Sequence, residues 1–300
     1  MSTTTQASTL ATRSSGQDTL SLAPKPRTQQ TLLVEVSSRD RNYTLAPAAN
    51  PFRFVFQRPL KDVQSVELLA GTIPATPYTL DTGYNTFMLL EGTTRFQVVI
   101  PPSFYTPASL VAALGVALNA VSGLQNTYVT SLDATTGQLV VTLVGGANHL
   151  YSFIFRSGSP ADDFEKTSGA LLQINTPATI LGFSSADATA ISGTLRSPFP
   201  VDTTLTRLYL YLNVETTQSL SVIERGMGRR SPFAIIYMDQ ATGGYKFLNK
   251  ETIQQTVFRL PQTLNRLQTL QVDIRDEFYR LVNFGGKDFT LLLQFSGLVA

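Results

Sequence analysis

The sequence predicts an all-β protein: a two-sheet β-sandwich, jelly-roll-like in topology, with one amphipathic helix near residues 107–121. From residue 31 to residue 300, short runs rich in Val, Ile, Leu, Phe, Tyr and Thr alternate with Gly, Pro, Asn and Asp, which is the composition of strands and turns. So many predicted strands favour two packed sheets over one isolated sheet. No internal repeat of fixed period is present, which argues against propellers and solenoids.

Residues 1–30 are expected to form a flexible polar arm ahead of this body. They are rich in Ser, Thr and Gln, and they hold too little apolar surface to offset the entropy of ordering. Two interpretations stay open: a disordered leader, or an arm that becomes ordered against a neighbouring molecule. The arm lacks the apolar stretch of a secretory signal, so synthesis in the cytosol is expected.

Residues 31–300 form the predicted sandwich body. A chain of 300 residues with 43% hydrophobic and 15% charged residues can fill one large core or two ordinary ones. The body could therefore divide into two subdomains that meet near residues 185–200. No apolar run approaches the roughly 20 residues that cross a bilayer, so no transmembrane segment is expected.

The first strands are predicted from alternating apolar and polar residues, which indicate a sheet with one buried face. Turn residues predict loops at Ser38–Asn42 and Arg58–Asp62, and Pro59 cannot donate a hydrogen bond within a central strand. Glu91–Thr94 is expected to join a strand pair. The strands expected in this part are Leu32–Ser37, Phe52–Phe56, Val63–Ala70, Asn85–Leu90 and Phe96–Ile100.

The single predicted helix begins at Thr106 and Pro107, a hydroxyl residue for the N-cap and a proline for the first helical position. Gly123 is its expected end. The helix should pack against a sheet edge or close one end of the sandwich. Its apolar face, at three- and four-residue spacing, consists of Leu110, Val111, Leu114, Leu118 and Val121.

The remaining chain returns to the β pattern. Tyr128–Leu132 and Gln138–Val144 flank the glycine-containing turn Asp133–Gly137 and predict a hairpin. Loops are expected to dominate from residue 156 to residue 200, where Gly, Asp and Pro recur. Further strands are expected at Tyr151–Phe155, Leu205–Glu215, Leu220–Glu224, Phe233–Met238, Tyr245–Leu248, Gln254–Leu260, Leu267–Arg275 and Phe289–Phe295.

Residues for catalysis are scarce. The chain has no cysteine, one histidine and no Gly-x-Ser-x-Gly pentapeptide, so nucleophilic catalysis is not expected. His149 follows a strand in Gly145–Leu150 and is interpreted as a solvated loop residue. No catalytic residue and no cofactor are predicted, and the chain is not expected to be an enzyme.

Acidic residues cluster at Asp162, Asp163 and Glu165, and again at Asp276 and Glu277. Both clusters have turn-like surroundings and are interpreted as solvated loop charges. The alternating ligand spacing of a calcium loop is absent, so no metal site is predicted. A hydrolase that draws two acids from separate strands remains the least favoured alternative.

Basic residues gather once, in the segment Arg225–Arg230. The segment fits neither phosphate-binding glycine motif, and it connects two expected strands. Its arginines, Arg225, Arg229 and Arg230, are candidates for contact with a partner. The other arginines are scattered and the aromatic residues occupy strand positions, so nucleic-acid binding is not expected.

The expected body is electrically neutral. Residues 1–30 hold three basic residues against one acidic residue, which leaves 20 of each sign among the 23 basic and 21 acidic residues of the chain. Near-zero net charge removes long-range repulsion between copies and so permits self-association.

Several linked phrases resemble one family of proteins. Each phrase is only a strand with its turn, so the order of the phrases carries the resemblance. They are Ser38–Tyr43, Phe52–Phe56, Pro59–Val63, Val66–Pro74, Tyr84–Phe87, Ile100–Pro102 leading into Tyr105–Pro107, Leu181–Phe183, and Leu267–Phe295 with Asp276–Glu277 and Val282–Phe284. Over most of residues 31–298, the chain resembles the minor capsid proteins of large icosahedral (nucleocytoplasmic) DNA viruses of algae and protists.

The resemblance implies a jelly-roll-like virion protein without enzymatic activity. Such a protein would bridge or cement capsomers of the major capsid protein, bind that protein and other minor capsid proteins, and assemble in the host cytoplasm. Phe278–Arg280 departs from the family pattern, in which a more acidic, glycine-containing turn is usual. The place in the shell therefore stays open, and a penton-like vertex protein is an alternative. A carbohydrate- or receptor-binding sandwich module is another, weakened by the absence of tryptophan.

Overall fold

The computed structural model of the 300-residue chain describes residues from Thr28, at the start of the first strand, to Val299. The predicted arm therefore lies outside the described residues, apart from its last three positions. The description covers residues 28–299 except 45–47, 146–149, 156–164, 169–170, 175, 185, 215–218, 221–231, 239–243, 250–251 and 255–256.

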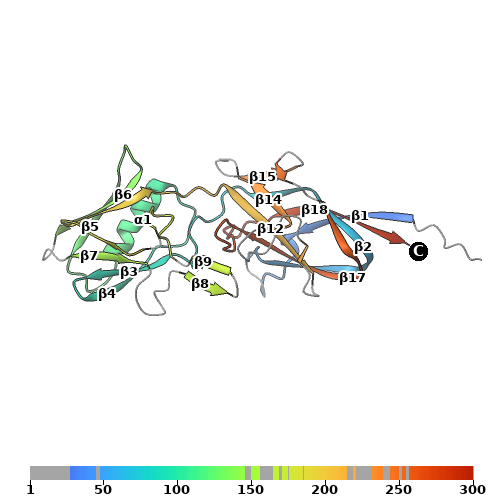
Figure 1. Cartoon of the computed structure of the whole chain (residues 1–300), viewed down its shortest axis with the longest axis horizontal. Helices are drawn as coiled ribbons and strands as arrows, with labels where there is room; N and C mark the ends of the chain where they lie inside the picture. Colours follow the sequence, from blue (N-terminus) through green and yellow to red (C-terminus); the bar gives the residue numbers. More distant parts are fainter. Residues whose placement is uncertain are drawn as a thin grey trace, which may run out of the picture.

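The described residues form two lobes that lie side by side along the long axis of the molecule (Figure 1). Residues 28–74 and 207–299 make up the large lobe. Residues 75–206 make up the inserted lobe, which lies in the sequence between strands β2 (Phe52–Pro74) and β12 (Arg207–Val214) of the large lobe. The chain crosses between the lobes twice, near residues 75–79 and near residues 202–206.

The large lobe consists of one nine-stranded sheet, in the order β1-β18-β2-β17-β12-β14-β16, with β13 paired to β12 and β15 to β2. All of its pairings are antiparallel. The strands are β1 (Thr28–Ser37), β2 (Phe52–Pro74), β12 (Arg207–Val214), β13 (Ser219–Leu220), β14 (Ala234–Tyr237), β15 (Tyr245–Leu248), β16 (Ile253–Gln254), β17 (Val257–Arg275) and β18 (Thr290–Val299).

One predicted loop is wrong in this lobe, and two strands predicted as separate are one, because β2 and β17 are continuous. β2 spans the expected loop at Arg58–Asp62, and β17 joins the strands that the sequence separates between Leu260 and Leu267. The two strands pair along their length with register shifts on β17 at Arg259/Leu264 and Leu267/Thr269. Such bulges accommodate a residue without a donor, such as Pro59, and the positive φ of 51° at Asp62.

The inserted lobe holds three sheets: β10-β7-β3-β4 and β11-β6-β5, which share a core, and the separate pair β8-β9. The predicted hairpin at residues 128–144 is present as β5 paired with β6. The expected loop region 156–200 is partly wrong, since it contains β8 to β11, and Pro198 and Pro200 lie in the edge strand β11, where proline is tolerated. The strands are β3 (Thr86–Glu91), β4 (Thr94–Val99), β5 (Thr127–Leu132), β6 (Gln138–Gly145), β7 (Tyr151–Ile154), β8 (Glu165–Ser168), β9 (Leu171–Ile174), β10 (Ala188–Thr189) and β11 (Thr194–Pro200).

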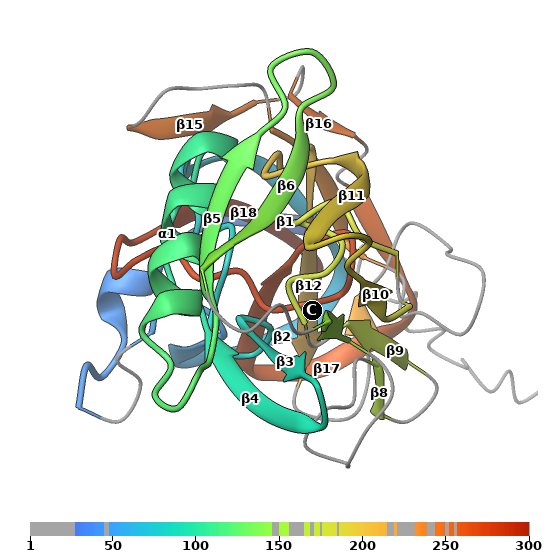
Figure 2. The ribbon, with the colours of Figure 1, turned by 90° about the vertical axis from the view of Figure 1, so that its left-hand side faces the viewer.

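The helix α1 (Pro107–Asn119) forms as its cap residues predict. The side chain of Thr106 accepts a hydrogen bond from the backbone N–H of Ser109, and the Ser109 hydroxyl accepts one from Thr106 N–H, which completes a capping box. The helix ends earlier than the predicted residue 121, because the Asn119 side chain bonds both backbone groups of Tyr128 in β5. Figure 2 shows α1 running alongside β5.

The buried hydrophobic residues form two large cores, one in each lobe. The core of the large lobe draws on β1, β2, β12, β14, β17 and β18, so its single sheet wraps around its own apolar face. The core of the inserted lobe lies between its two larger sheets and α1, with the fully buried Leu114 and Phe153 among its members. The prediction of an all-β sandwich architecture with an amphipathic helix is confirmed.

Candidate functional site at the junction of the two lobes

Most residues that the sequence singles out lie outside the described residues. This holds for the three candidate contact residues, Arg225, Arg229 and Arg230, for His149, and for Asp162 and Asp163. Glu165 begins β8. Asp276 and Glu277 are described, and they lie between β17 and β18, where the two lobes meet.

The interpretation of Asp276 as a solvated charge is wrong. Asp276 is buried, and its carboxylate accepts hydrogen bonds from the backbone N–H groups of Phe278 (2.9 Å) and Arg280 (2.8 Å). Its second oxygen lies 2.6 Å from Nε of Arg280, whose side chain is 3% exposed. The turn folds back on itself, so the Asp276 side chain, which was expected in solvent, is buried in charge-assisted hydrogen bonds with the turn.

Arg280 joins the two lobes. Its guanidinium lies 3.9 Å from the centroid of the Tyr84 ring, and Tyr84 belongs to the core of the inserted lobe. The ring of Phe278 approaches the same guanidinium at 4.7 Å. Burial raises the pKa of Tyr84 above its ordinary value, although the charge of Arg280 opposes that rise, so the hydroxyl stays protonated. The contact is a desolvated cation–π interaction.

A second contact holds the same junction at the first crossing of the chain. The backbone N–H of Tyr78 donates to the carbonyl of Asn283 at 2.7 Å, and Lys287 Nζ lies 3.2 Å from the Thr76 hydroxyl. Gly285 has a positive φ of 62°, and a Cβ at this position would lie 2.7 Å from the Tyr78 ring. The β17–β18 connection therefore fits closely against the crossing segment.

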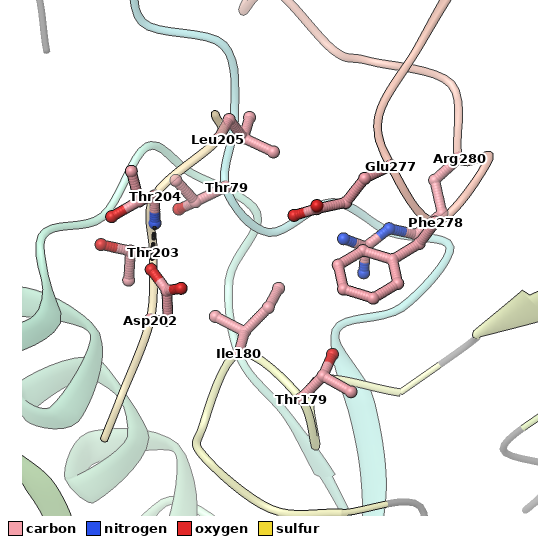
Figure 3. Close-up of a pocket in the computed structure, with 10 residues that line it drawn as sticks. All are labelled: Thr79, Thr179, Ile180, Asp202, Thr203, Thr204, Leu205, Glu277, Phe278 and Arg280. Atoms are coloured by element: carbon pink, nitrogen blue, oxygen red, sulfur yellow. Dashed lines mark hydrogen bonds between the residues drawn. The ribbon is translucent and has the colours of Figure 1, made fainter. Parts of the chain in front are cut away.

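A small pocket opens at this junction (Figure 3). Asp202, Thr203 and Thr204 lie on one side of it, Arg280 lies on the other, and the carboxylate of Glu277 points between them. Two buried atoms in its wall, Nη1 of Arg280 and Oγ1 of Thr179, have no hydrogen-bond partner among the described residues. The complete lining is Thr79, Thr179, Ile180, Asp202, Thr203, Thr204, Leu205, Glu277, Phe278 and Arg280.

The charges around this pocket act on Glu277. Burial raises the pKa of Glu277, and the nearby carboxylates of Asp276 and Asp202 raise it further, while Arg280 and Arg207 act in the opposite direction. Two carboxylates and two guanidinium groups therefore surround this half-buried carboxyl group, and its burial is the largest cause of the raised pKa. Ionising that group costs stability, which makes the junction sensitive to pH.

The dimensions of the pocket argue against a substrate site. Its volume is about 60 Å³, room for a few water molecules. Sites for small organic ligands enclose about 300 Å³ or more. Within the described part of the chain, no group of three or more His, Cys, Asp or Glu side chains is placed to hold a metal ion. What the contacts of the junction do is connect the two lobes.

A second buried network of ion pairs and hydrogen bonds lies in the large lobe, directly after β1, in the segment Ser38–Tyr43. The buried Arg41 forms an ion pair with Asp288 and donates to the carbonyl of Ser38, and its guanidinium lies 4.1 Å from the Tyr43 ring centroid. The Ser38 hydroxyl donates to Asp288 and accepts from the backbone N–H of Phe289. These bonds tie the end of β1 to the start of β18.

The sequence reasoning missed the role of Arg280. The signal was present in Phe278–Arg280, the segment that departs from the family pattern, since an arginine beside two aromatic residues is a common cation–π arrangement. The partner Tyr84 lies almost two hundred positions earlier in the chain, and no local pattern relates the two.

Among the helices of the described residues, none is both long enough and apolar enough to span a bilayer. The model of a family of unknown function (DUF5901) matches residues 21–152, a stretch that includes parts of both lobes. No curated protein matches the chain. Among solved structures, the crystal structure of the mavirus penton protein is similar with 9% sequence identity and a TM-score of 0.42, over 90% of this chain and 100% of that chain.

Proposed function

We propose that the chain is a non-enzymatic structural component of a large DNA virus capsid. As a minor capsid protein, it would bridge or cement capsomers of the major capsid protein and contact other minor capsid proteins. Its location would be the virion, after assembly in the host cytoplasm. Two lobes fixed to each other by a buried junction would give such a bridge a defined length and direction.

The observation that carries this proposal is the position of the family-like phrases in the fold. Ser38–Tyr43 contains the ion pair and hydrogen bonds that tie the end of β1 to the start of β18. Phe52–Phe56 contributes aromatic rings to the core of the large lobe. Val66–Pro74 is the part of β2 that pairs with β18 and, from Gly71 on, with β15. The phrases serve the framework and not a ligand site, as expected of a protein whose function is to occupy a place in an assembly.

Surface exposure supports the same proposal. Large apolar side chains are more than half exposed at several separate places, among them Val116 on α1, Ile191 near β11 and Phe247 on β15. Interfaces between proteins bury apolar side chains of this kind at their centres. Their distribution over both lobes suits a protein with several neighbours better than a protein with one ligand.

Cross-linking mass spectrometry on purified particles tests the proposal. Lysine- and carboxyl-reactive reagents report on the arm through Lys25, on the large lobe through Lys61 and on the inserted lobe through Asp133. We expect links from both lobes to the major capsid protein, and particles dissociated before the reaction serve as the control. Links near Arg229 would identify the basic segment as a contact.

The distribution of links also separates the two capsid roles. Links concentrated on capsomers across the facets support a cementing protein, whereas labelling confined to the five-fold vertices supports a penton-like protein. Absence of the chain from purified particles would overturn both roles. In that case binding to a glycan array becomes the decisive measurement for the receptor-binding alternative.

A further inference from the structure

The first strand, β1, is an unusually open sheet edge. It pairs with β18 over all ten of its residues, and no other described strand pairs with it. In an antiparallel edge strand, every second residue directs its N–H and C=O groups away from the sheet. Figure 1 shows β1 and the last part of β18 extending beyond β2 and β17 at the right-hand end of the molecule.

The other described edges are blunted in the ways that proteins use to prevent edge pairing. β10, β13 and β16 have two residues each, and β8, β9 and β15 have four. β11 contains two prolines, and β4 carries Arg95 near its start. On β5, the Asn119 side chain bonds both the N–H and the C=O of Tyr128. β1 has ten residues, no proline and a single charge, at Glu35.

Exposed apolar side chains accompany this edge. Leu32 is 47% exposed and Leu33 is 56% exposed, and the two point to opposite faces of the sheet. On the core face, Val36 is completely buried, Val34 is partly buried and Leu32 is half exposed, so burial decreases toward the N-terminal end of β1. Opposite Leu32 on β18 lies the buried Phe295. The apolar layer of the large lobe therefore continues to the edge and is left uncovered there.

From this edge we infer that two copies of the chain pair through β1, in an antiparallel arrangement that joins their nine-stranded sheets. The inference goes beyond the proposed place in a capsid, because it concerns the isolated chain. A two-fold axis perpendicular to the sheet places one residue of β1 opposite itself. The same edge then supplies donors and acceptors to both copies, so the pairing is closed at two chains.

The side chains select the register of this pairing. When Leu33 lies opposite Leu33 of the second copy, Leu32 lies opposite Val34 of the second copy, and three consecutive positions match apolar with apolar. Glu35 then lies opposite Thr31 of the second copy, so no like charges meet. A register centred on Leu32 instead would set Gln30 against Val34, which leaves an apolar side chain against a polar one. β18 carries no charged residue, and the body is neutral overall, so repulsion between copies is weak.

Engineered cysteines test the register, because the chain has no cysteine of its own. Directly opposite residues in antiparallel strands lie about 4.5–5.5 Å apart between Cα atoms, within the span of a disulfide. Under mild oxidation, full-length Leu33→Cys should form a disulfide-linked dimer. Val144→Cys, on β6 of the other lobe and somewhat more exposed, should not. Leu32→Cys alone should link poorly but should link well when mixed with Val34→Cys.

Sedimentation of the full chain provides the reversible measurement. Wild-type protein should show a monomer–dimer equilibrium, and Leu33→Lys should weaken the dimer about tenfold or more by placing like charges opposite each other. Val144→Lys should leave the equilibrium unchanged, and equal melting temperatures of the variants exclude misfolding. Linking at Leu33→Cys no better than at Val144→Cys, or a wild-type chain that sediments only as a monomer, would overturn the inference.

Discussion

The guanidinium of Arg280 covers the ring of Tyr84 at 3.9 Å, so one residue of the large lobe closes over the core of the inserted lobe. Asp276 holds Arg280 in this position through a 2.6 Å bond to Nε. Both charged side chains are almost completely buried. The contact between Arg280 and Tyr84 joins the two lobes, and no described sheet extends from one lobe into the other.

Replacing Arg280 should therefore destabilise the protein strongly. Arg280→Ala leaves the Asp276 carboxylate buried without its partner, and breaking a buried ion pair in this way costs about 3–5 kcal/mol. The loss is measured in urea on the first unfolding transition, since that transition separates the lobes and breaks the junction. Arg39→Ala is the control, since Arg39 is 77% exposed and lies 3.9 Å from Asp288; its effect should be too small to separate from wild type. Equal effects of the two substitutions would contradict a structural role for the junction.

Gly182 should tolerate no side chain. Its φ is +80°, and a Cβ would lie 2.2 Å from the carbonyl oxygen of Phe199 and 2.8 Å from that of Pro200. Gly182→Ala should therefore cost more than the ~1–3 kcal/mol typical of a strained backbone alone. Gly92→Ala is matched for positive φ, at +57°, but its Cβ meets nothing within 4 Å. The difference between the two variants in thermal unfolding measures the steric clash, and no difference would contradict this packing.

Stability at neutral pH should rise when Glu277 loses its charge. The pKa of Glu277 is raised in the folded state, so the folded protein binds a proton more tightly than the unfolded chain does. Stability therefore falls as pH rises through the interval between the ordinary carboxyl pKa and the raised one. Glu277→Gln removes this loss, so it should stabilise the protein at pH 7 and have little effect at acid pH.

Asp288 provides the control with the opposite sign. Burial acts to raise its pKa, but hydrogen bonds from Arg41 and Ser38 outweigh burial and lower it. The stability that the ionised Asp288 contributes is present above the pKa of Asp288 in the unfolded chain. It is lost as pH falls through the lower pKa of Asp288 in the folded protein. Asp288→Asn should thus destabilise the protein at pH 7 and have a smaller effect at acid pH. Parallel pH profiles for the two variants would show that the assigned charges are wrong.

The two cores should unfold as separate units. Leu114 and Leu210 are completely buried, one in each lobe, and each substitution by alanine should cost about 2–5 kcal/mol. In calorimetry, we expect two transitions, of which Leu114→Ala shifts one and Leu210→Ala shifts the other. A single transition that both substitutions shift equally would indicate one cooperative unit.

Removal of residues 1–27 should leave the fold intact and weaken incorporation into particles. The cut has to end at Arg27, because β1 begins at Thr28, and a deletion of residues 1–30 would also remove the first three positions of β1. Circular dichroism should match that of the full chain. Normal incorporation of the truncated protein into particles would contradict a tethering role for the arm.

Much of the fold could be predicted because its signals are local. Thr106 and Pro107 mark the start of α1, and the helix begins there because capping depends on neighbours a few positions away. The alternation in Phe52–Phe56 likewise indicates one buried face, and Phe52 and Phe56 are buried. The continuity of β2 through Pro59 was missed, because bulges opposite β17 compensate for a residue that locally signals a loop.

The candidate site could not be predicted to the same degree. Asp276 and Arg280 are four positions apart, yet their burial depends on contact with Tyr84 and with the pocket wall around Thr179. A turn with two charges is typical of a solvated loop, and that local signal is misleading wherever a second lobe covers the turn. Cation–π and ion-pair partners are chosen in space, so sequence spacing carries little information about them.

By itself, the sequence determined the β class, the amphipathic helix α1 and the absence of cysteine, since composition and short-range periodicity suffice for these. Only the tertiary structure decided that residues 75–206 form a lobe with its own core, that Arg280 closes the junction over Tyr84, and that β1 is left as an open edge. The physical reason is that strand pairing and burial join residues far apart in the chain, such as Val36 with Leu291, and the free energy of those contacts overrides local preference.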